Sequence, residues 1–179
     1  MSASGRGDRP MANSYWVVPG RFAAGEYPGS LNRADADRRL RRLLRAGIDH
    51  FIDLTRPADG LEPYEPMLRE QAYAERMEVR WEPHPVVDMS VPSVEAMTSI
   101  LDAIDGAIDA GRTVYVHCWG GIGRTGTVVG CWLVRRGLTG DDALKQIAEW
   151  WKHVEKSRRV PRSPQTHEQH EYVRHWAER

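Results

Sequence analysis

The segment from His117 to Gly126 reads HCWGGIGRTG, and it constrains the fold more than any other part of the chain. The four residues before it, TVYV, are β-branched and aromatic and predict a buried strand, whereas residues 125 to 136 predict a helix. A strand, a tight glycine-rich loop and a helix therefore meet at Cys118. In α/β folds, ligands bind at the carboxyl ends of such strands.

The loop has the composition of an anion-binding site. Gly120, Gly121 and Gly123 can adopt a positive φ and carry no side chain, so successive backbone N–H groups can turn inward. The amino terminus of the following helix adds its positive dipole end, and Arg124 adds a planar group that can hold two phosphate oxygens. These positive charges favour the thiolate form of Cys118. The sequence thus predicts a dianionic phosphate beside a nucleophilic sulfur.

This pattern resembles the phosphate-binding loop of the cysteine-dependent protein tyrosine phosphatases, His-Cys-x-x-Gly-x-x-Arg-[Ser/Thr]-Gly. The matching residues are His117, Cys118, Gly121, Arg124, Thr125 and Gly126. Nucleotide-binding P-loops differ, because they carry a Lys-[Ser/Thr] pair that is missing from this loop. The resemblance implies a single α/β domain with a mostly parallel central sheet flanked by helices. The short chain, without a segment resembling a tyrosine-recognition loop, is closer to the compact dual-specificity branch.

The residues and the resemblance together imply a two-step hydrolysis of a phosphate monoester, without metal or organic cofactor. Cys118 attacks phosphorus, Arg124 holds the equatorial oxygens, and the Thr125 hydroxyl donates to the sulfur when the thiolate leaves. His117 is expected to point away from the phosphate and to orient the loop. The remaining phosphate-binding positions are Trp119, Gly120, Gly121, Ile122 and Gly123.

A proton donor for the leaving oxygen is predicted at Asp88. It lies in the segment HPVVDMSVPS, residues 84–93, whose prolines and serines exclude regular structure. In the resembled family the general-acid loop precedes the nucleophile by one helix and one strand, as Asp88 precedes Cys118. The alternative is that Asp88 is only a turn-forming residue.

Two glutamines form a third candidate element. Gln165 and Gln169 are four residues apart, so they share one face of a helix predicted to begin near Ser163. They resemble the glutamine motif that positions water for hydrolysis of the phosphoenzyme in part of this family. By that analogy Gln165 positions the water and Gln169 is second to it. A pair of exposed glutamines would produce the same pattern.

The other elements follow from hydrophobic periodicity and from capping residues. Strands are predicted at 15–18, 21–24, 50–55, 79–82 and 113–116, and helices at 33–46, 63–77, 93–110, 125–136, 139–154 and from 163 onward. Ser93, and Thr139 with Asp142, read as amino-terminal caps. Asp53 and Arg56 follow a predicted strand and are candidates for a pocket rim. Cys131 is expected in the core.

Composition sets the outer limits. The 179 residues are 41% hydrophobic and 28% charged, which suits one globular domain at 14–179 behind a disordered tail at 1–13. The net charge of zero does not favour nucleic acid or membrane as a partner, and the basic run 152–162 reads as solvated surface. No stretch resembles a signal peptide or a membrane span, so a cytoplasmic monomer is the default expectation. The histidines form no metal-ligand pattern.

The expected substrate is a phosphorylated protein or peptide, with phosphotyrosine first and phosphoserine or phosphothreonine open. Loop positions 119–123 carry no lysine, which disfavours highly charged inositol phosphates. A phosphatase acting on a phosphoinositide or another non-protein phosphomonoester, an RNA 5′-phosphatase and a phosphate-binding pseudophosphatase stay open as alternatives. A sulfurtransferase is disfavoured, because persulfide chemistry needs neither Asp88 nor the Arg-Thr-Gly ending of the loop.

Overall fold

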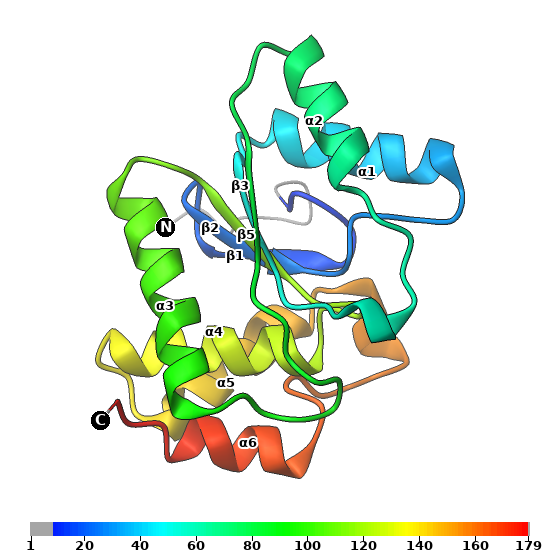
Figure 1. The fold of residues 1–179 in the computed structure, drawn as a ribbon. Helices are drawn as coiled ribbons and strands as arrows, with labels where there is room; N and C mark the ends of the chain where they lie inside the picture. Colours follow the sequence, from blue (N-terminus) through cyan, green and yellow to red (C-terminus); the bar gives the residue numbers. More distant parts are fainter. Residues whose placement is uncertain (1–8, 179) are drawn as a thin grey trace, which may run out of the picture.

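The computed structural model describes residues 9–178, and a five-stranded sheet runs through the middle of them (Figure 1). The strands are β1 (Ser14–Val18), β2 (Phe22–Gly25), β3 (His50–Asp53), β4 (Arg80–Pro83) and β5 (Val114–His117). They lie in the order β1-β2-β5-β3-β4, in which β1 is antiparallel to β2 and the other neighbours are parallel. The glycine-rich loop that follows β5 therefore begins at the centre of the carboxyl edge of the parallel strands.

Helices cover both faces of this sheet, as predicted for an α/β fold. They are α1 (Arg33–Arg45), α2 (Glu65–Ala74), α3 (Val94–Asp109), α4 (Gly123–Arg135), α5 (Gly140–Trp151) and α6 (His167–Arg174), with 3-10 turns η1 (Pro57–Asp59) and η2 (Glu155–Arg158). Figure 1 shows α1 and α2 on one side of the sheet and α3 to α6 on the other. Each layer closes its own hydrophobic core against the sheet.

The alternation of side chains along β5 decides what each residue near the loop can reach. Val114 and Val116 pack into the core under α3 to α6, whereas Tyr115 packs into the core under α1 and α2. His117 continues this alternation and contacts Tyr64 and Tyr115 on the α2 side. Cys118 joins the opposite core. Neighbouring residues of one strand therefore serve opposite faces of the sheet.

The helix after the loop, α4, is buried along most of its length because α3, α5 and α6 surround it. Small residues allow this close packing. A Cβ atom added to Gly130 would lie 2.6 Å from Val173 Cγ1 of α6, and one added to Gly126 would lie 2.5 Å from Ser163 Oγ. The amino terminus of α4 is thus held in place by the carboxyl-terminal part of the domain.

Most predicted elements are confirmed to within a few residues. The Ser93 side chain accepts the Ala96 N–H at 3.1 Å to cap α3, and Thr139 Oγ1 accepts the Asp142 N–H at 3.1 Å to cap α5. The prediction of a helix starting near Ser163 was wrong. Ser163 is buried and donates to the Ile122 carbonyl oxygen at 2.8 Å, and α6 begins only after its cap at Thr166.

The predicted amino-terminal tail falls partly outside the described residues. Residues 1–8 of the predicted tail lie outside the described residues. Residues 9–13, by contrast, pack against the domain: the Met11 side chain is buried in the core under α1 and α2, and its backbone exchanges two hydrogen bonds with the Ser14 hydroxyl. The apolar Met11 side chain explains why order begins before Tyr15.

Candidate active site

The glycine-rich loop packs tightly against the end of β2. The Tyr27 N–H donates to the Trp119 carbonyl oxygen at 3.0 Å. Gly121 has a φ of 72°, and a Cβ atom there would lie 2.4 Å from the backbone carbon of Gly25. Of the three loop glycines predicted to allow a positive φ, only Gly121 has one. At Gly123 an added Cβ atom would lie 2.9 Å from the Gln169 amide, so a side chain there would crowd Gln169. Backbone approach therefore defines this loop.

A lysine that the sequence analysis assigned to solvated surface braces the same loop. Lys156 Nζ, in η2, donates to the Gly120 carbonyl oxygen at 3.2 Å and lies 2.8 Å from Glu26 Oε2. Glu26 is mostly buried, and its backbone carbonyl accepts the Tyr115 hydroxyl at 2.6 Å. Lys156 was missed because its role depends on a contact with residue 120, 36 positions away in the chain.

Arg124 is buried, with 1% of its side chain exposed, and four groups hold its guanidinium. Nη1 donates to Asp59 Oδ2 at 2.6 Å and to the carbonyl oxygens of Val86 and Leu54 at 3.0 and 3.4 Å. Nη2 lies 3.2 Å from Asp88 Oδ1. Asp59 was not predicted from the sequence as part of this site. Its position just after β3, whose carboxyl end lies beside that of β5, was the available signal.

Two buried donors at the start of α4 have no partner among residues 9–178. They are Arg124 Nε and Thr125 Oγ1. Buried polar atoms without partners are uncommon in folded proteins and need an explanation. An anionic ligand oxygen beside the loop would accept from Arg124, and the thiolate of Cys118 would accept from Thr125. Both atoms therefore suit the roles predicted for them.

The segment that carries Asp88 folds over the arginine. Val86 is buried and supplies a backbone acceptor to Arg124, whereas 53% of the Asp88 side chain is exposed. Met89 has a φ of 61°, which is unusual for a residue with a side chain. Asp88 therefore faces both solvent and Arg124, a position that suits the general acid predicted from the sequence.

The prediction that Gln165 and Gln169 share one helix face was wrong, because Gln165 precedes the cap of α6 and only Gln169 lies in the helix. Gln169 is fully buried: Oε1 accepts the N–H groups of Gln165 and Thr166, both at 3.1 Å, and Nε2 donates to the Ser90 carbonyl oxygen at 3.2 Å. Its amide thereby joins the start of α6 to the segment carrying Asp88. The Gln165 side chain is exposed beside this clamp.

His117 supports the loop from behind the sheet, and its ring bonds define its tautomer. Nδ1 lies 3.2 Å from the Cys118 carbonyl oxygen, which can only accept, so Nδ1 carries the proton. Nε2 then accepts the Tyr64 hydroxyl at 2.7 Å. Burial lowers the pKa of His117 and raises the pKa of Tyr64. A neutral histidine thus connects Tyr64 to the backbone of the predicted nucleophile.

The other predicted residues are placed as follows. Cys131 is buried in the core, as expected, and burial raises the pKa of its thiol. Ile122 is buried and precedes α4, whereas 60% of Trp119 is exposed. Within residues 9–178 no three His, Cys, Asp or Glu side chains converge to hold a metal ion. In the same part of the chain no helix is long and apolar enough to cross a membrane.

Comparisons with known proteins identify a family that this chain matches over most of its length. Residues 11–173 match the model of the Swiss Army Knife protein DSP-PTPase phosphatase domain, called PTP-SAK. The crystal structure of Tk-PTP in its active form is 30% identical, with a TM-score of 0.63 over 90% of this chain and 93% of that chain. It has the size and the architecture described here.

Curated relatives match shorter regions. An uncharacterised protein of Methanocaldococcus jannaschii, MJECL20, is 34% identical over 89 residues, which are 50% of this chain and 54% of that protein. PTEN1 of Arabidopsis thaliana, named as a phosphatidylinositol 3,4,5-trisphosphate 3-phosphatase and protein-tyrosine-phosphatase, is 26% identical over 133 residues, 73% of this chain and 31% of that protein.

The matched region covers about half the length of the first of these relatives and about a third of the second. In this chain a cysteine follows the central parallel strand β5, and a buried arginine lies at the start of the next helix. Both features agree with the match to a phosphatase domain, whose common chemistry is the hydrolysis of phosphomonoesters. On these grounds the chain belongs to the dual-specificity-like PTP-SAK family within the cysteine-dependent protein tyrosine phosphatase superfamily.

Proposed function

We propose that this protein hydrolyses phosphotyrosine in proteins or peptides through a cysteinyl-phosphate intermediate and without a metal ion. The observation that carries the choice of substrate is the exposure of three apolar side chains, Val87, Met89 and Trp119. These three side chains are about half exposed or more, and they flank Asp88 and Cys118 in the chain. An aromatic ring carrying the phosphate would bury against them.

In the first step the Cys118 thiolate attacks phosphorus in line with the leaving oxygen. The backbone N–H groups of the loop and the Arg124 guanidinium hold the three equatorial oxygens, and the buried site strengthens these interactions. Asp88 donates its proton to the departing phenolic oxygen. The P–S bond forms as the P–O bond to the tyrosine breaks.

In the second step water attacks the phosphocysteine. Asp88, now a carboxylate, accepts a proton from this water, and the thiolate leaves with a hydrogen bond from Thr125. Gln165 is exposed, its backbone N–H donates to Gln169, and its side chain is proposed to position the water. The buried Gln169 fixes the segment that carries Asp88 through Ser90. Inorganic phosphate is released and Cys118 is regenerated.

The name of the Arabidopsis relative supports a phosphoinositide as a second candidate substrate. The composition of the loop disfavours a phosphoinositide substrate. Residues 119–123 offer no cationic side chain to a multiply phosphorylated ring, and the nearby Lys156 is already engaged by Glu26. A phosphoinositide with several phosphates would leave some of them unpaired beside apolar side chains, which costs desolvation free energy.

The test compares substrates in excess chelator. A phosphotyrosine peptide, the matching phosphoserine peptide and a soluble phosphoinositide are offered to the wild type and to the variants Cys118→Ser, Asp88→Asn and Trp119→Ala. We expect the highest kcat/KM for phosphotyrosine, no turnover by the first variant and a large loss of kcat in the second. Trp119→Ala raises KM for the peptide and leaves hydrolysis of a small alkyl phosphate close to the wild-type value. Turnover by Cys118→Ser, or preference for the phosphoinositide, would refute the proposal.

A further inference from the structure

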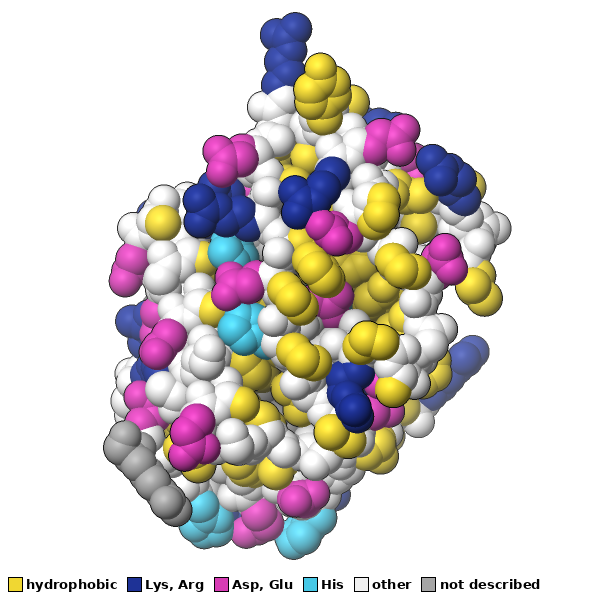
Figure 2. All heavy atoms as spheres, viewed as in Figure 1, with side chains coloured by type: hydrophobic (Ala, Val, Ile, Leu, Met, Phe, Trp, Pro, Cys, Tyr) yellow, Lys and Arg dark blue, Asp and Glu magenta, His cyan; other side chains and the backbone are white. Residues whose placement is uncertain are grey.

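A second cavity, of about 270 Å³, opens on the α2 side of the sheet. None of its lining residues belongs to the phosphate-binding loop. Aromatic and proline side chains line most of it, and the full set is Tyr27, Asp53, Thr55, Arg56, Pro57, Leu61, Pro63, Tyr64, Glu65, Trp81, Pro83 and Pro85. Figure 2 shows hydrophobic side chains gathered over the middle of the molecular face in view, with an acidic side chain lying deeper between them. The cavity is in the size range of a site for a small ligand or a single side chain.

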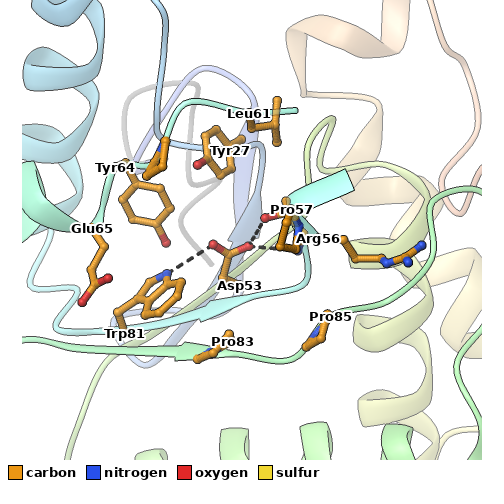
Figure 3. A pocket seen from close by; sticks show the side chains of 12 residues that line it. Tyr27, Asp53, Arg56, Pro57, Leu61, Tyr64, Glu65, Trp81, Pro83 and Pro85 are labelled. Atoms are coloured by element: carbon orange, nitrogen blue, oxygen red, sulfur yellow. Dashed lines mark hydrogen bonds between the residues drawn. The ribbon is translucent and has the colours of Figure 1, made fainter. Parts of the chain in front are cut away.

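Asp53 is the most deeply buried of the three charged residues that line this cavity. It ends β3, and only 5% of it is exposed. Oδ1 accepts the Thr55 N–H at 2.9 Å and the Thr55 hydroxyl at 2.6 Å, and Oδ2 accepts Trp81 Nε1–H at 3.2 Å. Three donors occupy both carboxylate oxygens and fix the orientation of the side chain. Figure 3 shows Tyr27, Tyr64 and Trp81 arranged around this carboxylate.

No Lys or Arg side chain within residues 9–178 forms an ion pair with Asp53. His117 Nδ1 lies 3.9 Å from Asp53 Oδ1, but burial lowers the pKa of this histidine, so its ring is neutral at physiological pH. Arg56 lines the cavity, but its side chain points away from Asp53 in Figure 3. Glu65 is already paired with Arg69 at 2.7 Å. A buried carboxylate without a cation is costly, and a bound cation would remove part of that cost.

We propose that this cavity binds an organic ammonium group. Aromatic rings attract a cation through their π faces, and this attraction strengthens where water is excluded. An anion would be repelled by Asp53, and a neutral ligand would leave its charge unpaired. The apolar Pro57 and Leu61 would contact the alkyl groups around the nitrogen. This site does not depend on the reaction proposed for Cys118.

The same chemistry could come from a free amine or from a lysine side chain of the substrate. The site lies close enough to the active site for either source to matter. Thr55 and Arg56 precede Asp59, which holds Arg124. Pro83 directly precedes residues 84–93, the segment that carries Asp88, and Pro85 belongs to that segment. Occupancy would therefore reach both segments that frame the phosphate.

The indole N–H of Trp81 reports on the site directly, because it donates to Asp53. The probe is choline, compared with its neutral carbon isostere, in which a tert-butyl group replaces the trimethylammonium group. We expect choline to shift the Trp81 indole resonance in nitrogen-15 NMR spectra, assigned from a Trp81→Phe spectrum, and to bind at least about tenfold more tightly than the isostere. Equal binding of the two, or no shift with choline at millimolar concentration, would overturn the proposal.

Variants test whether the binding occurs in this cavity. Leu61→Lys places a tethered ammonium group in the cavity and should reduce choline affinity at least about tenfold. The matched control is Leu31→Lys, which adds the same charge at a leucine that is 92% exposed and outside the cavity, and which should bind choline like the wild type. Asp53→Asn should also abolish binding, with the other indole resonances reporting whether the protein stays folded. Unchanged binding by Leu61→Lys would contradict the assignment.

Peptide binding determines whether the ammonium group comes from a free amine or from a lysine of the substrate. This peptide experiment rests on the proposed function. Phosphotyrosine peptides carrying either lysine or norleucine near the phosphotyrosine are titrated into the Cys118→Ser protein. A Trp81 shift with lysine peptides alone identifies a substrate side chain as the ligand, whereas choline binding with no lysine effect identifies a free amine. Failure of both peptides to bind would count against the proposed function, while the choline result would still decide the cavity.

Discussion

Replacing Asp59 by asparagine tests how Arg124 is held. Asp59 Oδ2 accepts Arg124 Nη1 at 2.6 Å, and the two side chains are 9% and 1% exposed. The same oxygen also accepts the Arg56 N–H at 3.2 Å. Asparagine keeps the size and one acceptor oxygen but removes the charge. The substitution therefore weakens the interaction without opening a large cavity.

The expected magnitude follows from this geometry. A hydrogen bond to a charged group contributes about 1.5–3 kcal/mol, and each 1.4 kcal/mol corresponds to about tenfold in rate or affinity. The Val86 carbonyl oxygen still accepts from Nη1, and Asp88 cannot replace Asp59 because about half of its side chain is in solvent. If the full interaction orients Arg124 for the phosphate, Asp59→Asn lowers kcat/KM by roughly tenfold to a hundredfold.

The assay is hydrolysis of para-nitrophenyl phosphate, together with the inhibition constant of inorganic phosphate. Both should weaken in Asp59→Asn, because the substrate and the product use the same guanidinium. The control is Glu62→Gln, an exposed acid in the same connection, which should stay close to the wild type. A kcat/KM value within about threefold of the wild type in folded Asp59→Asn would refute the reasoning. It would mean that the backbone carbonyls alone orient the arginine.

Three other predictions use the neighbouring residues. Gln169→Ala should lower both kcat and the free energy of unfolding, because Gln169 joins two segments. Gln165→Ala should slow only phosphoenzyme hydrolysis and so increase the pre-steady-state burst. Equal losses of stability in the two variants would contradict these separate roles. Iodoacetate should alkylate Cys118 and leave Cys131 unmodified, because burial raises the pKa of the Cys131 thiol. Peptide mass spectrometry of the native protein treated with iodoacetate measures this. Labelling of both cysteines would contradict the burial argument. Because burial lowers the pKa of His117, the folded protein favours the neutral ring: this stability is complete above the unfolded value of about 6.5 and is lost as pH falls below it. The urea midpoint should therefore fall on acidification, and less steeply in His117→Asn; parallel slopes would contradict the assignment.

Local sequence determined the elements and the chemistry of the phosphate loop. The run TVYV predicted β5, the caps Ser93 and Thr139 predicted where α3 and α5 begin, and HCWGGIGRTG predicted the loop and its arginine. These signals are readable because hydrophobic periodicity, capping and turn formation depend on residues a few positions apart. The family also follows from this short segment, since its spacing is the feature that the chemistry requires.

Tertiary structure alone decided which distant residues complete the site. Asp59 holds Arg124 from 65 positions away, Lys156 braces Gly120 from 36 positions away, and Gln169 reaches Ser90 across 79 positions. No local pattern distinguishes these side chains from the many similar ones on the surface. Their roles arise because the parallel strands bring their carboxyl ends to one edge of the sheet, where burial removes water and makes each polar partner matter.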